Sequence, residues 1–280
     1  MYHCLSQKSV IGIDVGNNYV SLVKLCNKRI VDYKIVVNND VNDALKSITN
    51  KRINNSLVVM GLRYKSILTK SIILDASLSY YEIEKYLYGN IERYFGILPQ
   101  HVAIDFEIAK INRKQVSVKL IVAKRDDINL MLTLSAKANI KLRVLDVEHF
   151  ALARAILSLF ELSNNEQFIV IHNKEEYLLF CFIKNKQIVY TTEVKVLDNN
   201  ITQLIIKELQ LFLTINNLLI GKLILTGSYI EIDTEIIKEA INPSLILIQY
   251  NPFLNLNSKD EFLAKYSLFL SYGFALWRNG

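Results

Sequence analysis

The chain has 280 residues, of which 51% are hydrophobic and 21% charged, and its formal net charge is +6 at pH 7. A chain of this length can bury a sizeable core in one or two domains, and with 3 Pro and 9 Gly residues it has no room for a long disordered linker. The Lys and Arg residues are scattered, and the 3 Cys and 4 His residues lack zinc-site spacing, so we expect neither a nucleic-acid-binding protein nor a zinc protein.

The first part of the chain predicts strands interrupted by one helix. VIGIDV is a buried run, and a two-residue turn at Asn27 and Lys28 separates two further strands. Asp40 is placed to cap the helix. The expected elements are strands at 10–15, 19–25, 29–37 and 57–62, with a helix between about 40 and 48.

The pattern changes from about Thr69 onwards. The segment SYYEIEKYLYGNIERYF has apolar residues at helical spacing on or near one face, namely Ile83, Leu87, Ile91 and Phe95. Asp126 and Asp127 mark the start of another helix, where acidic side chains are favourable. We expect strands at 71–75, 102–109, 114–124 and 142–148, and helices at 79–95, 126–138 and 149–160. His149 is interpreted as a residue of a helix start rather than a catalytic group.

The second half repeats the three-strand opening at 168–194. It continues with a long helix at about 200–215, a strand at 222–227, a short helix, a strand at 244–248 and a C-terminal helix at about 260–277. Strands and helices alternate throughout, which indicates an α/β fold. The C-terminal helix is apolar around most of its circumference and no flexible tether precedes it, so we interpret it as a core helix rather than a membrane anchor.

Two segments of the chain align as copies of one unit. VIGIDVGNNYVSLVKLCNKRIV (10–31) and FIVIHNKEEYLLFCFIKNKQIV (168–189) match without a gap, and Tyr19 falls on Tyr177. Asp14, however, falls on His172, and Gly16 falls on Lys174. The repeat predicts a duplicated architecture with a cleft between the halves, and the lost Asp and Gly suggest that this cleft no longer works as an enzyme.

The motif IDVGNN is the candidate for chemistry in the first copy. A glycine such as Gly16 permits close backbone approach, and the amides of the turn at Asn17 and Asn18 suit a phosphate. Asp14, at the end of the strand, can hold a magnesium ion through its water shell. Asp and Gly are also ordinary turn residues, so the motif alone does not decide between a phosphate-binding loop and an ordinary turn.

The order of these motifs resembles the actin/sugar kinase/Hsp70 superfamily and, within it, the PilM family of type IV pilus assembly, with the cell-division protein FtsA more distantly similar. The resemblance covers nearly the whole chain through IGIDVGNNYVSLVKL, LRVLDVEHFALARAI, ITQLIIKELQLFL, LILTG and YGFALW. It implies duplicated actin-like (RNase H-like) domains that flank a cleft, with an inserted FtsA/PilM-type subdomain. The implied parts are a first subdomain at 1–65 and 142–161, the insertion at 66–141, a reduced second half at 162–260 and a C-terminal helix at 261–280 that packs on the core.

The chain departs from the pattern that the resemblance implies for nucleotide binding. His172 and Lys174 stand where a second Asp-x-Gly loop is expected. Both could bind a phosphate as cations, but we favour the interpretation that they are surface-turn residues. Gly227 and Ser228 stand at the adenosine loop, and Leu204 replaces an acid expected at the ribose, which leaves Lys207 as the nearest polar residue. The retained nucleotide contacts would be Asp14, Gly16, Asn17, Asn18, Lys207, Gly227 and Ser228, with Asp14 near magnesium only if nucleotide binds.

The missing second Asp-x-Gly loop and the missing acid at the ribose should abolish phosphoryl transfer, because that reaction depends on positioning and charge neutralisation. We therefore predict no catalytic residues, absent or negligible hydrolysis and no required cofactor, with ATP and magnesium as the only candidate ligands.

The resemblance implies a cytoplasmic scaffold that is peripheral to the inner membrane through its partners. Those partners would be the N-terminal peptide of a PilN-like single-span protein, bound in a groove between the first subdomain and the insertion, and other pilus inner-membrane components. No signal peptide and no apolar run of 18 residues is present, in keeping with that location. The alternatives are a nucleotide-dependent ATPase or small-molecule kinase, an FtsA-like filament former and a component of a competence or type II secretion system.

Overall fold

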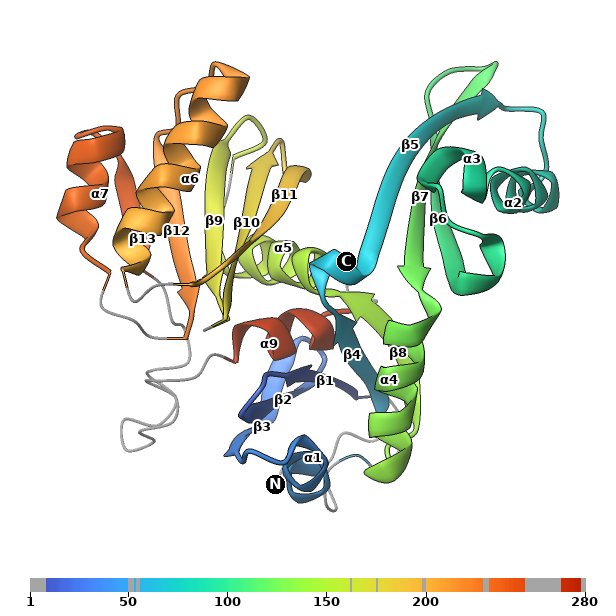
Figure 1. Ribbon diagram of the computed structural model, residues 1–280, viewed down its shortest axis with the longest axis horizontal. Helices are drawn as coiled ribbons and strands as arrows, with labels where there is room; N and C mark the ends of the chain where they lie inside the picture. The colour runs from blue at the N-terminus through green and yellow to red at the C-terminus, as the bar shows by residue number, and fades with distance from the viewer. Residues whose placement is uncertain are drawn as a thin grey trace. The chain divides into compact units, whose positions relative to one another are not determined.

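The computed structural model describes residues 9–49, 53, 56–161, 163–174, 176–197, 200–228, 232–249 and 268–277. The chain forms two compact units (Figure 1). We call Met1–Gly61 with Ser135–Gly280 the main unit, and Leu62–Leu134 the small unit. The small unit overlaps the predicted insertion at 66–141, while the boundaries of the functional subdomains stay predictions.

The first sheet of the main unit has the strand order β3-β2-β1-β4-β8. Its strands are β1 (Val10–Val15), β2 (Tyr19–Cys26), β3 (Arg29–Val37), β4 (Leu57–Leu62) and β8 (Leu142–Val147). Strands β1, β2 and β3 form an antiparallel meander, and β4 pairs parallel to β1. The helix α1 (Val41–Thr49) begins after Asp40, whose side chain accepts hydrogen bonds from the amides of Asn42 and Asp43 and so caps the helix as predicted.

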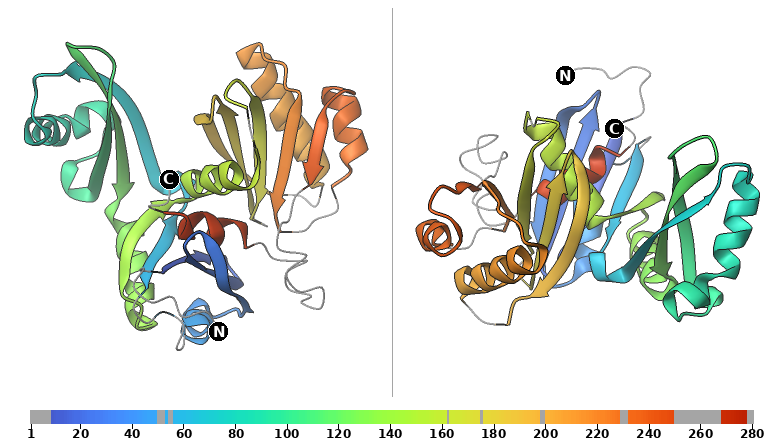
Figure 2. Two further views of the ribbon diagram at one scale, coloured as in Figure 1. Left: turned by 180° about the vertical axis from the view of Figure 1, so that it is seen from behind. Right: turned by 90° about the horizontal axis from the view of Figure 1, so that it is seen from above.

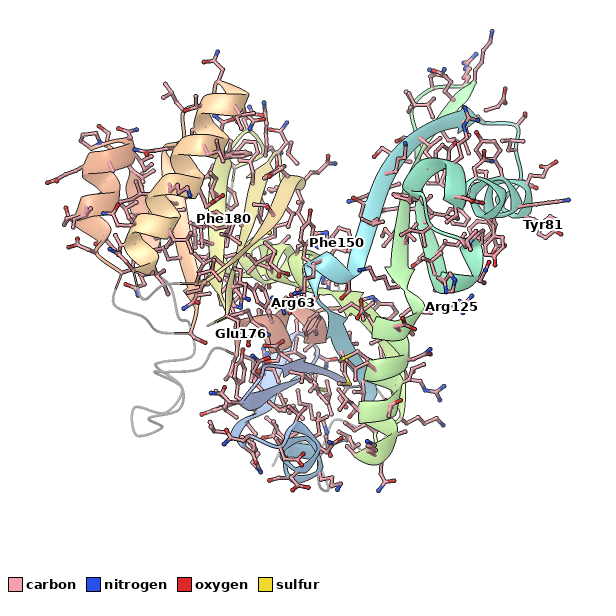
Figure 3. All side chains as sticks on the ribbon, in the orientation of Figure 1. Arg63, Tyr81, Arg125, Phe150, Glu176 and Phe180 are labelled. Carbon is pink, nitrogen blue, oxygen red and sulfur yellow. The ribbon has the colours of Figure 1, made fainter. Side chains whose placement is uncertain are left out.

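The second sheet has the equivalent order, β11-β10-β9-β12-β13. Its strands are β9 (Gln167–Asn173), β10 (Tyr177–Lys184), β11 (Gln187–Lys195), β12 (Lys222–Gly227) and β13 (Ile246–Gln249). The helices α6 (Ile201–Asn216) and α7 (Thr234–Ile241) belong to this half. Figure 3 labels Phe180, which lies in the hydrophobic core that this sheet forms with α6.

Backbone details confirm the duplication that the sequence predicts. The β2–β3 turn has Asn27 and Lys28 at φ 51° and 62°, and the β10–β11 turn has Asn185 and Lys186 at φ 54° and 61°. Positive φ at both central residues is typical of a type I′ hairpin turn. The register also shifts at aligned positions, between Lys24 and Leu25 in one hairpin and between Phe182 and Ile183 in the other. The two meanders are therefore copies of one unit.

Two helices fill the interior of the main unit between the sheets (Figure 2). They are α5 (Glu148–Leu159) and α9 (Phe269–Ala275), and every residue of α9 is buried. A Cβ at Gly12 of β1 would lie 2.0 Å from the Ser271 carbonyl oxygen, and one at Gly273 would lie 2.1 Å from the Ala151 carbonyl oxygen. Glycine at both positions thus lets α9 touch β1 and α5 directly. For Phe269–Ala275 the core interpretation is correct, and the rest of the predicted C-terminal helix up to residue 267 and from 278 lies outside the described residues.

The small unit is an antiparallel sheet of order β5-β7-β6 with helices on one face (Figure 2). Its elements are η1 (Tyr64–Ser66), β5 (Ile67–Asp75), α2 (Tyr80–Gly89), α3 (Ile91–Phe95), η2 (Pro99–His101), β6 (Val102–Lys110), β7 (Gln115–Lys124) and most of α4 (Arg125–Lys137). The predicted apolar face does form its core, with Ile83, Leu87 and Ile91 buried and Phe95 packed against them. Ser79 and Glu82 form a reciprocal capping box at the start of α2.

The single helix predicted at 79–95 is wrong in one respect, because α2 and α3 are separate helices. Asn90 lies between them, and its side-chain amide donates to the Tyr86 carbonyl oxygen at 2.8 Å. Such side-chain-to-backbone bonds compete with helix continuation. Among the residues that the structure describes, no helix is long and apolar enough to cross a membrane.

Candidate functional site

The predicted first phosphate loop and the predicted second one meet through a buried ion pair. The Nζ atom of Lys174 lies 2.7 Å from Oδ1 and 2.8 Å from Oδ2 of Asp14. Asp14 is 3% exposed and Lys174 is 6% exposed. Lys174 therefore contacts both oxygens of the carboxylate that the sequence assigned to magnesium.

Equivalent turns place these two loops. In the turn after β1, the Gly16 amide donates to the Tyr19 carbonyl oxygen at 2.9 Å, and in the turn after β9 the Lys174 amide donates to the Tyr177 carbonyl oxygen at 2.9 Å. A Cβ at Gly16 would lie 2.3 Å from the ring of Tyr19, so the first turn has no room for a side chain. The second turn carries the lysine side chain, which extends to Asp14.

A second carboxylate faces the same ammonium group. Glu148, the first residue of α5, is buried, and its Oε1 atom lies 3.6 Å from Nζ of Lys174. The hydroxyl of Tyr177 donates to this carboxylate at 2.7 and 2.8 Å from its two oxygens. A negative side chain at a helix N-terminus is also favoured by the helix dipole.

Tyr19, from the first repeat, contacts both members of the Asp14–Lys174 pair. Its hydroxyl donates to Oδ2 of Asp14 at 3.2 Å, and Nζ of Lys174 lies 5.6 Å from the centre of its ring. A cation over an aromatic ring at this distance is an attractive contact. The two aligned tyrosines, Tyr19 and Tyr177, thus serve different carboxylates of one cluster.

The charge states follow from burial and from mutual attraction. Burial alone would lower the pKa of Lys174, but Asp14 and then the two tyrosines and Glu148 raise that pKa well above its ordinary value. Burial raises the pKa of Glu148 while Lys174 opposes the shift. Burial also raises the pKa of Tyr19 and Tyr177, so both hydroxyls keep the protons they donate. Lys174 is therefore a buried cation that its neighbouring acids hold in the charged form.

The interpretation of His172 and Lys174 as surface-turn residues is wrong. His172 is 1% exposed, and its Nδ1 atom lies 2.8 Å from Oγ1 of Thr226. Burial, followed by the nearby charge of Lys174, lowers the pKa of His172 to about 3, so the ring is neutral. The side chains of His172 and Lys174 lie in the interior, where the second sheet approaches α9 and His172 faces Phe269, whereas Glu176, which Figure 3 labels, is exposed.

Gly227 has a conformational reason to be glycine. Its φ is 103°, and a Cβ there would lie 2.2 Å from the Asn173 carbonyl oxygen. The Ser228 amide donates to that oxygen at 2.9 Å, and the Asn173 side-chain amide returns a bond to the Ser228 carbonyl oxygen. This closure ties the end of β12 to the end of β9, while the buried hydroxyl of Ser228 has no partner within the described residues.

The remaining predicted residues lie at the edge of the cluster or outside it. Asn17 is exposed and Asn18 half-buried, and the Asn18 carbonyl oxygen accepts from the Asn38 amide at 2.9 Å. Lys207 is exposed on α6, while Leu204 packs against the core of the second half. Within the described part of the chain, no hydrogen bond or ion pair joins Lys207 to the other predicted residues. The structure thus brings together Asp14 and Lys174 but leaves Lys207 apart.

Glu148 and the two tyrosines were missed as members of the site. Glu148 stands next to His149 in DVEH, and the sequence interpretation placed it at the end of the strand 142–148. A strand followed by a helix is confirmed, but β8 ends at Val147 and α5 already begins at Glu148, one residue before the predicted start. The conserved spacing between the two repeats did pick out Tyr19 and Tyr177 as an aligned pair. That alignment, together with an acid at a buried helix start, was the available signal.

A magnesium ion would need free carboxylate oxygens here, because oxygen ligands and their water shells are what magnesium prefers. Asp14 already accepts from Lys174 and Tyr19, and Glu148 already accepts from Tyr177. Across the described ranges, no three His, Cys, Asp or Glu side chains come together as a ligand set. The residues as they stand do not fit a metal-bound nucleotide.

Comparison with solved structures defines the class of protein. A Bacteroides thetaiotaomicron protein with actin-like ATPase fold and unknown function matches with a TM-score of 0.53 and 13% identity over 89% of this chain and 94% of that chain. The cytoplasmic domain of EpsL, an inner membrane component of the type II secretion system of Vibrio cholerae, matches with a TM-score of 0.56 and 10% identity over 93% and 98%. The chain has the actin-like α/β fold that the sequence predicts.

A stronger similarity identifies the family. The structure titled PilM-PilN type IV pilus biogenesis complex matches with a TM-score of 0.74 and 16% identity over 95% of this chain and 97% of that chain. Residues 12–218 match the family model described as Type IV pilus assembly protein PilM. The chain belongs to this PilM family, and its role lies in type IV pilus assembly.

Proposed function

We propose that this protein is a cytoplasmic scaffold of type IV pilus assembly that binds the N-terminal cytoplasmic tail of a PilN-like inner-membrane protein and does not hydrolyse ATP. Family membership and the likeness to a PilM–PilN complex support the partner. The protein is peripheral to the inner membrane through this partner and through other pilus components. The formal charge of +6 suits work beside anionic lipids.

One observation carries the proposed independence from nucleotide, namely the buried pair of Lys174 and Asp14. Phosphoryl transfer needs a metal and cationic groups that neutralise phosphate charge. In this chain the ammonium group of Lys174 is paired with Asp14 at 2.7 and 2.8 Å, and both groups are buried. This cation is therefore not free to neutralise phosphate charge. A scaffold needs the fold rather than turnover, so it tolerates this arrangement.

A nucleotide-dependent ATPase is the second candidate, and Glu148 is the observation in its favour. A buried carboxyl group with a raised pKa is the kind of group that acts as a general base. The hydrogen bond from Tyr177 and the charge of Lys174, however, hold Glu148 in its present place. We therefore rank the scaffold first.

Calorimetric titration with a synthetic peptide of the PilN-like protein's cytoplasmic tail tests the proposal. A scrambled peptide of equal composition is the control, and each titration is run with and without Mg-ATP. We expect saturable binding of the native peptide only, with the same affinity in both conditions. Absence of binding would refute the partner, and binding that requires Mg-ATP would favour the ATPase.

A further inference from the structure

The cluster between the two repeats has complementary halves. One acceptor, Asp14, lies near the end of β1, and the other, Glu148, is the first residue of α5 and directly follows β8 of the same sheet. The donors that reach them across the junction, the Lys174 ammonium and the Tyr177 hydroxyl, both come from the second repeat. The junction therefore places two carboxylates around one cation, which is the arrangement of a cation-binding site.

We infer that Asp14 and Glu148 form a cation site whose resident cation is the protein's own Lys174, and that this ammonium group joins the two repeats in place of a bound metal–nucleotide. The inference concerns the same site as the proposed function and rests on its independence from nucleotide. It assigns Lys174 a positioning role, since the lysine acts by holding the two halves together.

Burial and charge balance support this assignment. The side chains of Lys174, Asp14 and Glu148 are 3%, 4% and 7% exposed, so water has little access to these three charged groups. His172, the other basic side chain of this loop, is neutral and bonds to Thr226. Among the described residues Lys174 is thus the cation that both carboxylates face. Without it, two buried carboxylates would lie in one low-dielectric site, which is unfavourable.

Gly16, the residue aligned with Lys174, explains why the second turn and not the first carries the cation. Gly16 has no room for a side chain, since its Cβ would meet the ring of Tyr19 at 2.3 Å. Lys174 forms the same backbone bond as Gly16 and extends its ammonium group to the opposite half. Lysine in place of the aligned glycine therefore supplies a cation that is covalently attached to the chain and held at the junction.

Chemical rescue of Lys174→Ala tests the inference. The substitution removes a propylammonium fragment, so we measure the Tm of the variant against n-propylammonium chloride. Sodium chloride at equal ionic strength and the bulkier tetramethylammonium chloride are the control salts. We expect the variant's Tm to fall by roughly 10 °C, because one partner of a buried pair is lost. We expect n-propylammonium alone to raise it again with a saturable dose dependence, while the wild type does not respond.

Lys222→Ala is the matched control variant. Lys222 pairs with Glu166 at a partly exposed position, where both side chains are more than a fifth exposed at 21% and 22%. Its loss should change the Tm by no more than about 3 °C, and n-propylammonium should not rescue it. Rescue of both variants alike would show a general salt effect and would overturn the inference.

A double variant keeps the test decisive if Lys174→Ala does not fold. Asp14→Asn with Lys174→Met removes both charges and retains most of the volume, so its Tm should exceed that of Lys174→Met alone. The inference is overturned if the double variant is no more stable than Lys174→Met, or if Lys174→Ala has the wild-type Tm. Binding of the PilN-like peptide to the wild type is scored separately, so that failure of the partner and failure of the internal cation remain distinct results.

Discussion

The turn after β1 and the turn after β9 make the same backbone hydrogen bond but carry different residues at its donor, Gly16 and Lys174. Gly16 and Lys174 make the same amide hydrogen bond at 2.9 Å, and the hairpins that follow have register shifts at aligned positions. At Gly16 the ring of Tyr19 leaves no room for a side chain, whereas Lys174 of the second turn extends a cation to Asp14. The comparison teaches that two copies of one unit can keep the same turn hydrogen bond while a single residue adds a buried ion pair between them.

Substitution of Asp14, the ion-pair partner of Lys174, should have the largest effect on stability. Asp14→Ala leaves Lys174 buried without its nearest anion, and we expect a loss of about 3–5 kcal/mol in the free energy of unfolding. Urea denaturation with an unchanged m-value would measure it. The exposed pair of Lys46 and Asp43 provides a control, and Asp43→Ala should cost at most about 1 kcal/mol. Equal losses in the two variants would contradict the account.

The glycine of the first turn should come next. Gly16→Ala brings a methyl group to 2.3 Å from the ring of Tyr19, and we expect a loss of roughly 1–3 kcal/mol from overpacking. Gly89→Ala is the control because Gly89 lies in α2 and a Cβ there meets nothing within 4 Å, so it should stabilise by up to about 1 kcal/mol. If Gly16→Ala were neutral, the two turns would not differ in space as described.

The aligned tyrosines sharpen the comparison by hydroxyl deletion. Tyr177→Phe removes the donor that lies 2.7 Å from Glu148, and we expect a loss of about 1–3 kcal/mol. Tyr19→Phe removes a longer bond of 3.2 Å to Asp14, a carboxylate that Lys174 still satisfies, so its loss should be about 0.5–1.5 kcal/mol. The reverse order in thermal denaturation would show that Glu148 does not depend on Tyr177.

His172 should produce the smallest effect, visible only as a function of pH. The imidazole of the unfolded chain takes up a proton below pH about 6.5, while burial keeps folded His172 neutral down to a pKa of about 3. The unfolded state therefore binds more protons in this window, and stability falls as pH falls through it. The Tm of the wild type should drop more between pH 7 and 5 than the Tm of His172→Asn. Identical pH profiles would contradict the buried neutral state.

Much of the fold was predictable because local patterns carry it. The apolar run VIGIDV, the Asn-Lys turns and the cap at Asp40 each fix an element through nearest neighbours. The gapless alignment of the two repeats also predicted a duplicated sheet, which the strand orders confirm. The break at Asn90 was not predicted, because it depends on the competition between one side-chain bond and one further helical turn.

The site was predicted only in part, because its contacts are long-range. Asp14 was singled out from its position at a strand end, but its partner Lys174 lies 160 residues further along the chain. Lysine in a turn is ordinarily solvated, and no local pattern distinguishes a turn lysine whose side chain is buried against a distant carboxylate. Glu148 was missed for the same reason, since a helix start shows its position in the element and not what it faces.

Titration of Mg-ATP into the wild-type protein and into Asp14→Asn by calorimetry tests the central claim most directly. If Lys174 already fills the cation site, neither protein should show saturable binding. Saturable binding to the wild type that Asp14→Asn abolishes would contradict the account, because it would show that Asp14 leaves Lys174 to serve a metal-bound nucleotide.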